Sequence, residues 1–189
     1  MIMSIFSKVQ IGRPKSSTFN LSYDRKFSMN MGDLVPMLVQ ECVPGDKFHI
    51  NTQQMLRMMP MVAPVMHEVN VFTHFFFVPN RILWKNWEKF ITGGEHGLDA
   101  TLLPNIPLNF CTPTIGSGEK DFRLADYMGL PVSPKMRDDF DNSQNVSLLP
   151  FLAYQKIYNE YYRDQNLIDS LDDLFSDVTD GSNTTASVS

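Results

Sequence analysis

The four histidines are the first residues to consider for chemistry, because imidazole binds metals and transfers protons near neutral pH. They are His49, His67, His74 and His96. His67 and His74 are seven positions apart, so on one extended strand they point to opposite faces. The adjacent pair His67 and Glu68 lacks the helical spacing of a zinc protease site. The spacing therefore predicts packing or surface histidines and no metal site.

Other catalytic groups are equally poorly represented. The run Gly116-Ser117-Gly118 lacks the lysine of a phosphate-binding loop and is interpreted as a turn. No serine and histidine form a nucleophile elbow. The carboxylates of Asp138, Asp139 and Asp141 could hold a divalent cation, but such a run is more often a solvated surface. Cys42 and Cys111 have no metal-ligand spacing. We expect no enzyme, no cofactor and no metal.

Positive charge gathers near the N-terminus, although the whole chain has a net charge of -5 and an isoelectric point near 5.3. The segment that carries this charge is polar, which suits loose, sequence-independent contact with phosphates. The alternative is that the segment is an ordinary solvated tail. The acidic total argues against a dedicated nucleic-acid-binding domain. The candidate nucleic-acid contacts are Lys8, Arg13, Lys15, Arg25 and Lys26.

Aromatic side chains form the second candidate set, in a chain that is 43% hydrophobic with 14 Phe and 12 Met. Four tyrosines between 154 and 162 follow at helical steps. Such a stripe is more often core or subunit interface than a platform for stacked bases. The candidate interface or core residues are Phe75, Phe76, Phe77, Trp84, Trp87, Phe151, Tyr154, Tyr158, Tyr161 and Tyr162.

Three strands are expected to position these groups. Residues 34–43 and 47–52 flank the turn Pro44-Gly45-Asp46 and predict a hairpin. Residues 65–78 are the clearest strand, because apolar side chains alternate along it and its later half is apolar on both faces. The methionine-rich residues 55–64 contain Pro60 and Pro64 and predict an apolar connection that is buried or covered by a neighbour.

Helices are expected in three places. Residues 80–91 have a helical period, with Asn80 as a cap and Gly93-Gly94 as the stop. A short helix is predicted at 124–128. Another should start after Ser147, with Pro150 in its first turn, and run to about Tyr162. Residues 95–120 are interpreted as loop.

Three parts follow from this pattern: an extended basic arm (1–33), a body with inserted helices (34–179) and a flexible polar end (180–189). The fold class is mainly β with inserted helices and long loops.

Read in order, four segments resemble the major capsid protein of the Microviridae, most closely its gokushovirus branch. They are Phe19 to Asp24 with Met31 to Pro36; Val43 to Phe48 leading to Arg57, Pro60 and Ala63 to His67; Phe75 to Arg81 with Trp84, Trp87, Phe90 and Ile91; and Leu149 to Phe151 through Tyr154, Ile157 to Asn159 and Tyr161 to Asp164. Their order and spacing over residues 19–165 make the resemblance specific.

The resemblance implies an eight-stranded antiparallel jelly roll with long inserted loops. It implies a structural subunit that self-assembles into an icosahedral shell around a circular single-stranded DNA genome. The implied partners are other copies, an internal scaffolding protein, a small basic DNA-packaging protein and the genome. The implied location is the virion, assembled in the host bacterial cytoplasm. No apolar run approaches the ~20 residues of a membrane span.

The chain departs from this pattern by its length. Three strands cannot close a jelly roll, so the sequence predicts an N-terminal portion whose fold is incomplete and which aggregates alone. The long loops between strands, 95–146, are expected to supply most contacts between subunits. The alternative function is a soluble single-stranded nucleic-acid-binding module that uses the basic arm and the tyrosine helix.

Overall fold

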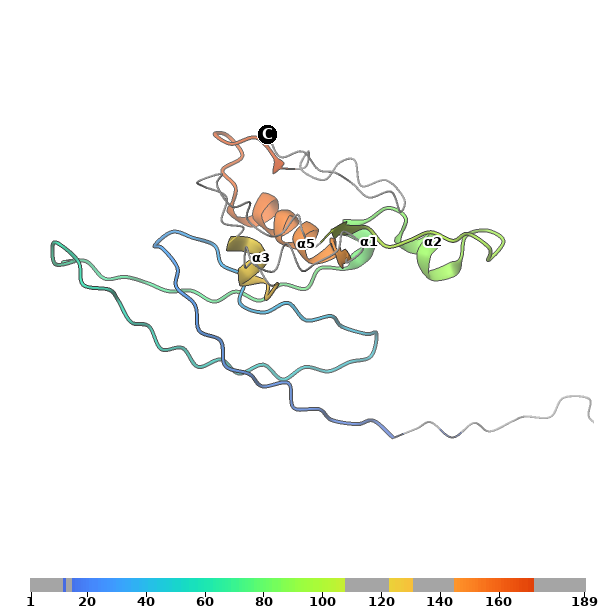
Figure 1. The fold of residues 1–189 in the computed structure, drawn as a ribbon, viewed down its shortest axis with the longest axis horizontal. Coiled ribbons are helices and arrows are strands. Elements are labelled where there is room, and N and C mark those ends of the chain that lie inside the picture. Colours follow the sequence, from blue (N-terminus) through green and yellow to red (C-terminus); the bar gives the residue numbers. More distant parts are fainter. Residues whose placement is uncertain (1–11, 13–14, 108–122, 131–144, 172–189) are drawn as a thin grey trace, which may run out of the picture.

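The computed structural model describes residues 12, 15–107, 123–130 and 145–171, and divides them into two unlike parts (Figure 1). Short helices gather around one longer helix, α5 (Leu149–Ile157). Beside them, residues 15–78 run as long extended stretches that reverse direction several times. The described chain is therefore low in helix, with one small antiparallel sheet.

The hydrophobic core lies where α3 (Arg123–Tyr127) and α5 meet that sheet. Strands β1 (Asn105–Pro107) and β2 (Asn145–Ser147) pair with Ile106 opposite Val146. The buried members of the core are Ile106, Ala125, Leu148 and Phe151. The prediction of loop over 95–120 is wrong at 105–107, because Ile106 finds a strand partner forty residues further along and is buried beneath it.

The helix expected over 80–91 is two helices, α1 (Asn80–Leu83) and α2 (Trp87–Thr92). Trp84 ends α1 in extended conformation, with φ −139° and ψ 122°, and its side chain is buried. This break turns the Trp84 ring inward, 6.1 Å from the ring of Phe90. Asn80 makes no capping side-chain bond and is the first helical residue, so that part of the prediction is wrong. Gly93 ends α2 with φ 75°, as predicted.

The helix expected after Ser147 is confirmed. The amide of Leu149 donates to the hydroxyl of Ser147 over 3.4 Å, and Pro150 occupies the first turn, where its missing N–H costs nothing. From Tyr158 the chain winds more widely as a π-helical turn, η2 (Tyr158–Tyr162), and ends at the expected residue. The short helix expected at 124–128 is also found, as α3, followed by Gly129 with φ 90°.

The three predicted strands, 34–43, 47–52 and 65–78, are extended but not paired within the described residues. Between residues 15 and 78 the backbone-to-backbone hydrogen bonds are those of two turns, Asp33 N to Asn30 O (3.4 Å) and Asp46 N to Val43 O (3.0 Å). The turn at Pro44-Gly45 is thus confirmed, with Gly45 at φ 99°. No ladder of backbone hydrogen bonds joins its flanking segments, so the predicted hairpin is not formed within the described residues.

The methionine-rich segment, residues 55–64, lies at one of these reversals, far from the helices (Figure 1). Its side chains face solvent. Met55 is 93% exposed and Met59 83%. The prediction that it is buried is wrong for the described structure, and cover by a neighbour stays a prediction.

Candidate functional site

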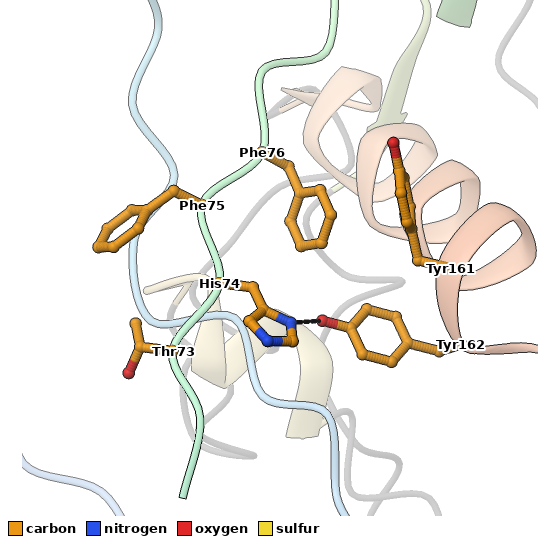
Figure 2. A pocket seen from close by; sticks show the side chains of 6 residues that line it. All are labelled: Thr73, His74, Phe75, Phe76, Tyr161 and Tyr162. Atoms are coloured by element: carbon orange, nitrogen blue, oxygen red, sulfur yellow. Dashed lines mark hydrogen bonds between the residues drawn. The ribbon is translucent and has the colours of Figure 1, made fainter.

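An open aromatic pocket of about 440 Å³ lies between the end of the 65–78 segment and η2 (Figure 2). The extended backbone sends alternate side chains to opposite sides, so His74 and Phe76 point to η2 while Thr73 and Phe75 point away. Nδ1 of His74 is hydrogen-bonded to the hydroxyl of Tyr162, and their rings stack with centroids 6.0 Å apart. Phe76 lies 5.0 Å from the ring of Tyr161. These contacts fasten the extended segment to the helical part.

The predicted aromatic set splits into core and surface. Trp84 and Phe151 are buried, and Trp87, Tyr154 and Tyr158 are half-buried beside them. In contrast, Phe77 is 79% exposed and Tyr161 70% exposed. Of the surface members, Phe75, Phe76, Tyr161 and Tyr162 line the pocket. Phe77 follows Phe76 as a further exposed ring, and the exposed Phe72 lies beside His74, with ring centroids 6.3 Å apart. A contiguous exposed apolar surface is unusual for a monomeric globular protein and is typical of an interface.

The basic arm is only partly described. Lys8 and Arg13 lie outside the described residues. Lys15 and Lys26 are exposed, as a phosphate contact requires. Arg25 is different, because it is half-buried and its guanidinium donates to two backbone carbonyls, Met37 O at 3.0 Å and Asp126 O at 3.0 Å.

Two tyrosines of the helical part also bind the chain that follows the arm. The hydroxyl of Tyr127 donates to Ser28 O at 2.7 Å, and that of Tyr154 donates to Leu34 O at 2.8 Å. Burial, with Tyr158 and Asp33 nearby, raises the pKa of Tyr154 above its ordinary value of 10.0, so the hydroxyl keeps its donor proton. Sequence reasoning missed Tyr127 and this role of Arg25, since the partners are main-chain carbonyls about a hundred residues away.

The groups that could bind a metal are dispersed in the part of the chain that the structure describes. Within it, no three His, Cys, Asp or Glu side chains are grouped to hold a metal ion. His74 is committed to Tyr162, and Cys42 is an exposed thiol. The acidic run 138–141, the glycines at 116 and 118, and Cys111 lie outside the described residues. None of the helices in the described ranges is long and apolar enough to cross a membrane.

Comparison with known proteins gives a consistent result. A family model described as "Capsid protein (F protein)" matches residues 7–188. Capsid protein VP1 of Chlamydia phage 1 is 38% identical over 169 residues, which cover 88% of this chain and 27% of that protein. The VP1 proteins of Bdellovibrio phage phiMH2K and Spiroplasma virus 4 are each 33% identical, over 86% and 82% of this chain and 28% and 27% of their own lengths.

The chain thus spans little more than a quarter of the curated relatives that it matches. The match covers both parts of the described structure, the extended stretches and the helices around α5. The alternative of a soluble single-stranded nucleic-acid-binding module has no support from these comparisons. The resemblance seen in the sequence is confirmed: the chain belongs to the capsid protein (F protein) family of small phages.

Proposed function

We propose that this chain is the N-terminal portion of a structural subunit that builds an icosahedral shell, and that it is not an enzyme. Family membership supports this, since the relatives are capsid proteins. The observation that carries the proposal is the state of residues 15–78. Their backbone is extended and almost free of internal hydrogen bonds, and apolar side chains project from it into solvent.

Extended backbone with unpaired amides and carbonyls is a template for strand pairing, and the exposed apolar side chains along it favour burial against a partner. The segments 34–43, 47–52 and 65–78 are therefore proposed as strands of the eight-stranded jelly roll, paired by polypeptide outside the described residues. The relatives, more than three times as long as the matched region, have ample chain for this.

Hydrogen–deuterium exchange tests the pairing. In shells assembled from the complete capsid polypeptide, the amides of residues 65–78 should exchange at least a hundredfold more slowly than in the isolated 189-residue chain. Helix α5 serves as the internal reference, since its hydrogen bonds exist in both. Equal, fast exchange of 65–78 in the two samples would refute the proposed strands.

The partners proposed for the whole protein are further copies of itself, an internal scaffolding protein, a small basic packaging protein and single-stranded DNA. Its place is the virion, after assembly in the host cytoplasm. The surface around the aromatic pocket is the proposed subunit contact, together with the loops within 95–146. The exposed arm cations Lys15 and Lys26 are proposed to meet phosphates, together with Lys8 and Arg13, which lie outside the described residues.

Charge reversal of these cations tests the arm. Lys15→Glu combined with Lys26→Glu should lower the DNA content of purified particles and leave the yield of empty shells unchanged, because loose phosphate contacts are electrostatic. A matched control is Lys85→Glu, which reverses an exposed cation outside the arm. If particles of the double variant contain the normal amount of DNA, these two cations do not contact the genome.

A further inference from the structure

Arg25 stands out among the residues at the start of the described chain. Between residues 15 and 33 it is the one side chain that is not exposed. Its neighbour Lys26 is exposed and has no hydrogen bond or ion pair within the described residues. Two adjacent cations on one polar segment therefore occupy opposite environments, and only one of them is available to a polyanion.

The guanidinium of Arg25 joins three stretches of chain. Nη1 donates to the carbonyl of Met37 and Nη2 to the carbonyl of Asp126, each over 3.0 Å. Met37 O also accepts the hydroxyl of Tyr23 at 3.1 Å, so both lone pairs of that oxygen are used. Asp126 belongs to α3, part of the core. The planar fork of an arginine suits two acceptors at a fixed separation, which an ammonium group does not match.

Further contacts follow along the same segment. Tyr127, next to Asp126, donates to Ser28 O, and its ring meets Phe27 edge-on with centroids 5.8 Å apart. Tyr154 of α5 donates to Leu34 O. Each bond joins a side chain to a main-chain carbonyl, and the only backbone-to-backbone bond between residues 15 and 37 is the local one of the Asn30–Asp33 turn.

From these contacts we infer that Arg25, Tyr127 and Tyr154 form a clasp that fastens residues 23–37, here called the strap, onto α3 and α5. Arg25 is the positioning residue of this clasp, a role proposed in place of the phosphate contact that the sequence suggested. Because the strap has so few backbone bonds of its own, the clasp side chains decide whether it lies on the helices. Releasing them would free the strap without dissolving the core.

Proteolysis of a variant panel distinguishes a clasp from a phosphate contact. Arg25→Ala, Arg25→Lys and Tyr127→Phe are made in the complete capsid polypeptide, with Lys26→Ala as the matched control that also removes one positive charge. Chymotrypsin cleaves the strap after Tyr23 and Phe27, two sites that no variant changes. Cleavage after Leu167, which is exposed and lies outside the strap and the proposed strands, normalises the rate.

The clasp predicts that loss of the arginine fork raises the cleavage rate in the strap by about tenfold, in line with the loss of hydrogen bonds from a charged group. Arg25→Lys should resemble Arg25→Ala, because charge alone does not bridge the two carbonyls. Tyr127→Phe keeps the edge-on ring contact but loses the hydrogen bond to Ser28 O, so the cleavage rate in the strap should rise about threefold. Lys26→Ala should stay at the rate of the unaltered protein.

A second readout, the DNA content of purified particles, distinguishes the two roles of Arg25, and Tyr127→Phe keeps the clasp testable if an Arg25 variant folds poorly. A phosphate contact predicts that Arg25→Lys restores packaging and that Arg25→Ala and Lys26→Ala lower it equally. That pattern, with strap cleavage unchanged in all variants, would overturn the assignment of Arg25. The cleavage assay does not depend on shell formation, so the clasp and the proposed shell function can fail independently.

Discussion

At the scale of single residues, Tyr154 links stability to pH. Its pKa is raised in the folded protein, mainly by burial, so the folded state holds the phenolic proton more tightly than the unfolded state does. The stabilisation is fully present below the unfolded pKa near 10 and is lost as pH rises through the higher folded value. Ionisation of the Tyr154 hydroxyl would also remove its hydrogen bond to Leu34 O, because the phenolate oxygen and the carbonyl oxygen repel each other.

The denaturation midpoint of the protein should therefore fall between about pH 9 and about pH 11. Tyr154→Phe should be less stable than the unaltered protein at the lower pH, and its midpoint should fall less on going to the higher one. Denaturant titrations at both pH values measure this. An identical fall in the two proteins would show that other tyrosines or lysines cause the alkaline loss.

Trp84 offers a second prediction at this scale. The side chain is 5% exposed, and its indole Nε1 has no hydrogen-bond partner among the described residues. Trp84→Ala should cost about 3–5 kcal/mol through the cavity that it leaves. Trp84→Phe should cost about 1 kcal/mol, because an aromatic ring remains and an unsatisfied donor is removed. Denaturation followed by circular dichroism compares the two, and equal losses would mean that the indole N–H has a partner.

At the scale of elements, the end of α2 depends on a glycine. Gly93 has φ 75°, and a Cβ added there would lie 3.1 Å from the backbone of Gly97. Gly97 has a similar φ of 69° but open space around it. Gly97→Ala should cost about 1 kcal/mol from the left-handed conformation alone. Gly93→Ala should cost at least about twice that, because the Gly97 backbone must also move. Comparable melting temperatures for the two variants would contradict the close approach.

Helices and turns were predictable because their signals are local. The start at Ser147 and Pro150, the stop at Gly93 and the turn at Gly45 all depend on residues within a few positions of one another. The break at Trp84 was not predictable, since it follows from burial of that side chain. The strand at 105–107 depends on a partner forty residues away, and no local pattern announces it.

At the scale of the whole molecule, alternation in the sequence identified the extended segments but could not supply their partners. A strand is defined by its ladder, and the described residues hold none for 34–43, 47–52 or 65–78. The candidate site likewise has a part that the sequence identified and a part that depends on distant contacts. Its aromatic members were found by type and spacing, whereas the clasp formed by Arg25 with distant carbonyls had no sequence signal.

The exposed aromatic surface should have opposite effects in the isolated chain and in the shell. Phe77→Lys places a charge at a 79% exposed position, so the isolated chain should aggregate less. In the complete polypeptide the same change should reduce shell yield at least tenfold, since a charge would be buried in an interface or core. Ile91→Lys, at an exposed apolar position of α2 outside the proposed strands and contact loops, is the matched control. Light scattering and electron microscopy give the two readouts, and normal shells from Phe77→Lys would exclude this position from any contact.

The methionine-rich segment has a consequence for the chemical resistance of the particle. A thioether that faces solvent is oxidised readily to the sulfoxide, which is polar and chiral and packs poorly against apolar surfaces. Met55 and Met59 of this segment, and Met66 just after it, are all exposed in the described chain. Peroxide should therefore modify them quickly before assembly and slowly once a neighbour covers them. Subunits oxidised in advance should assemble poorly, whereas finished particles should tolerate the same dose, so redox exposure during assembly sets a limit on how many particles form.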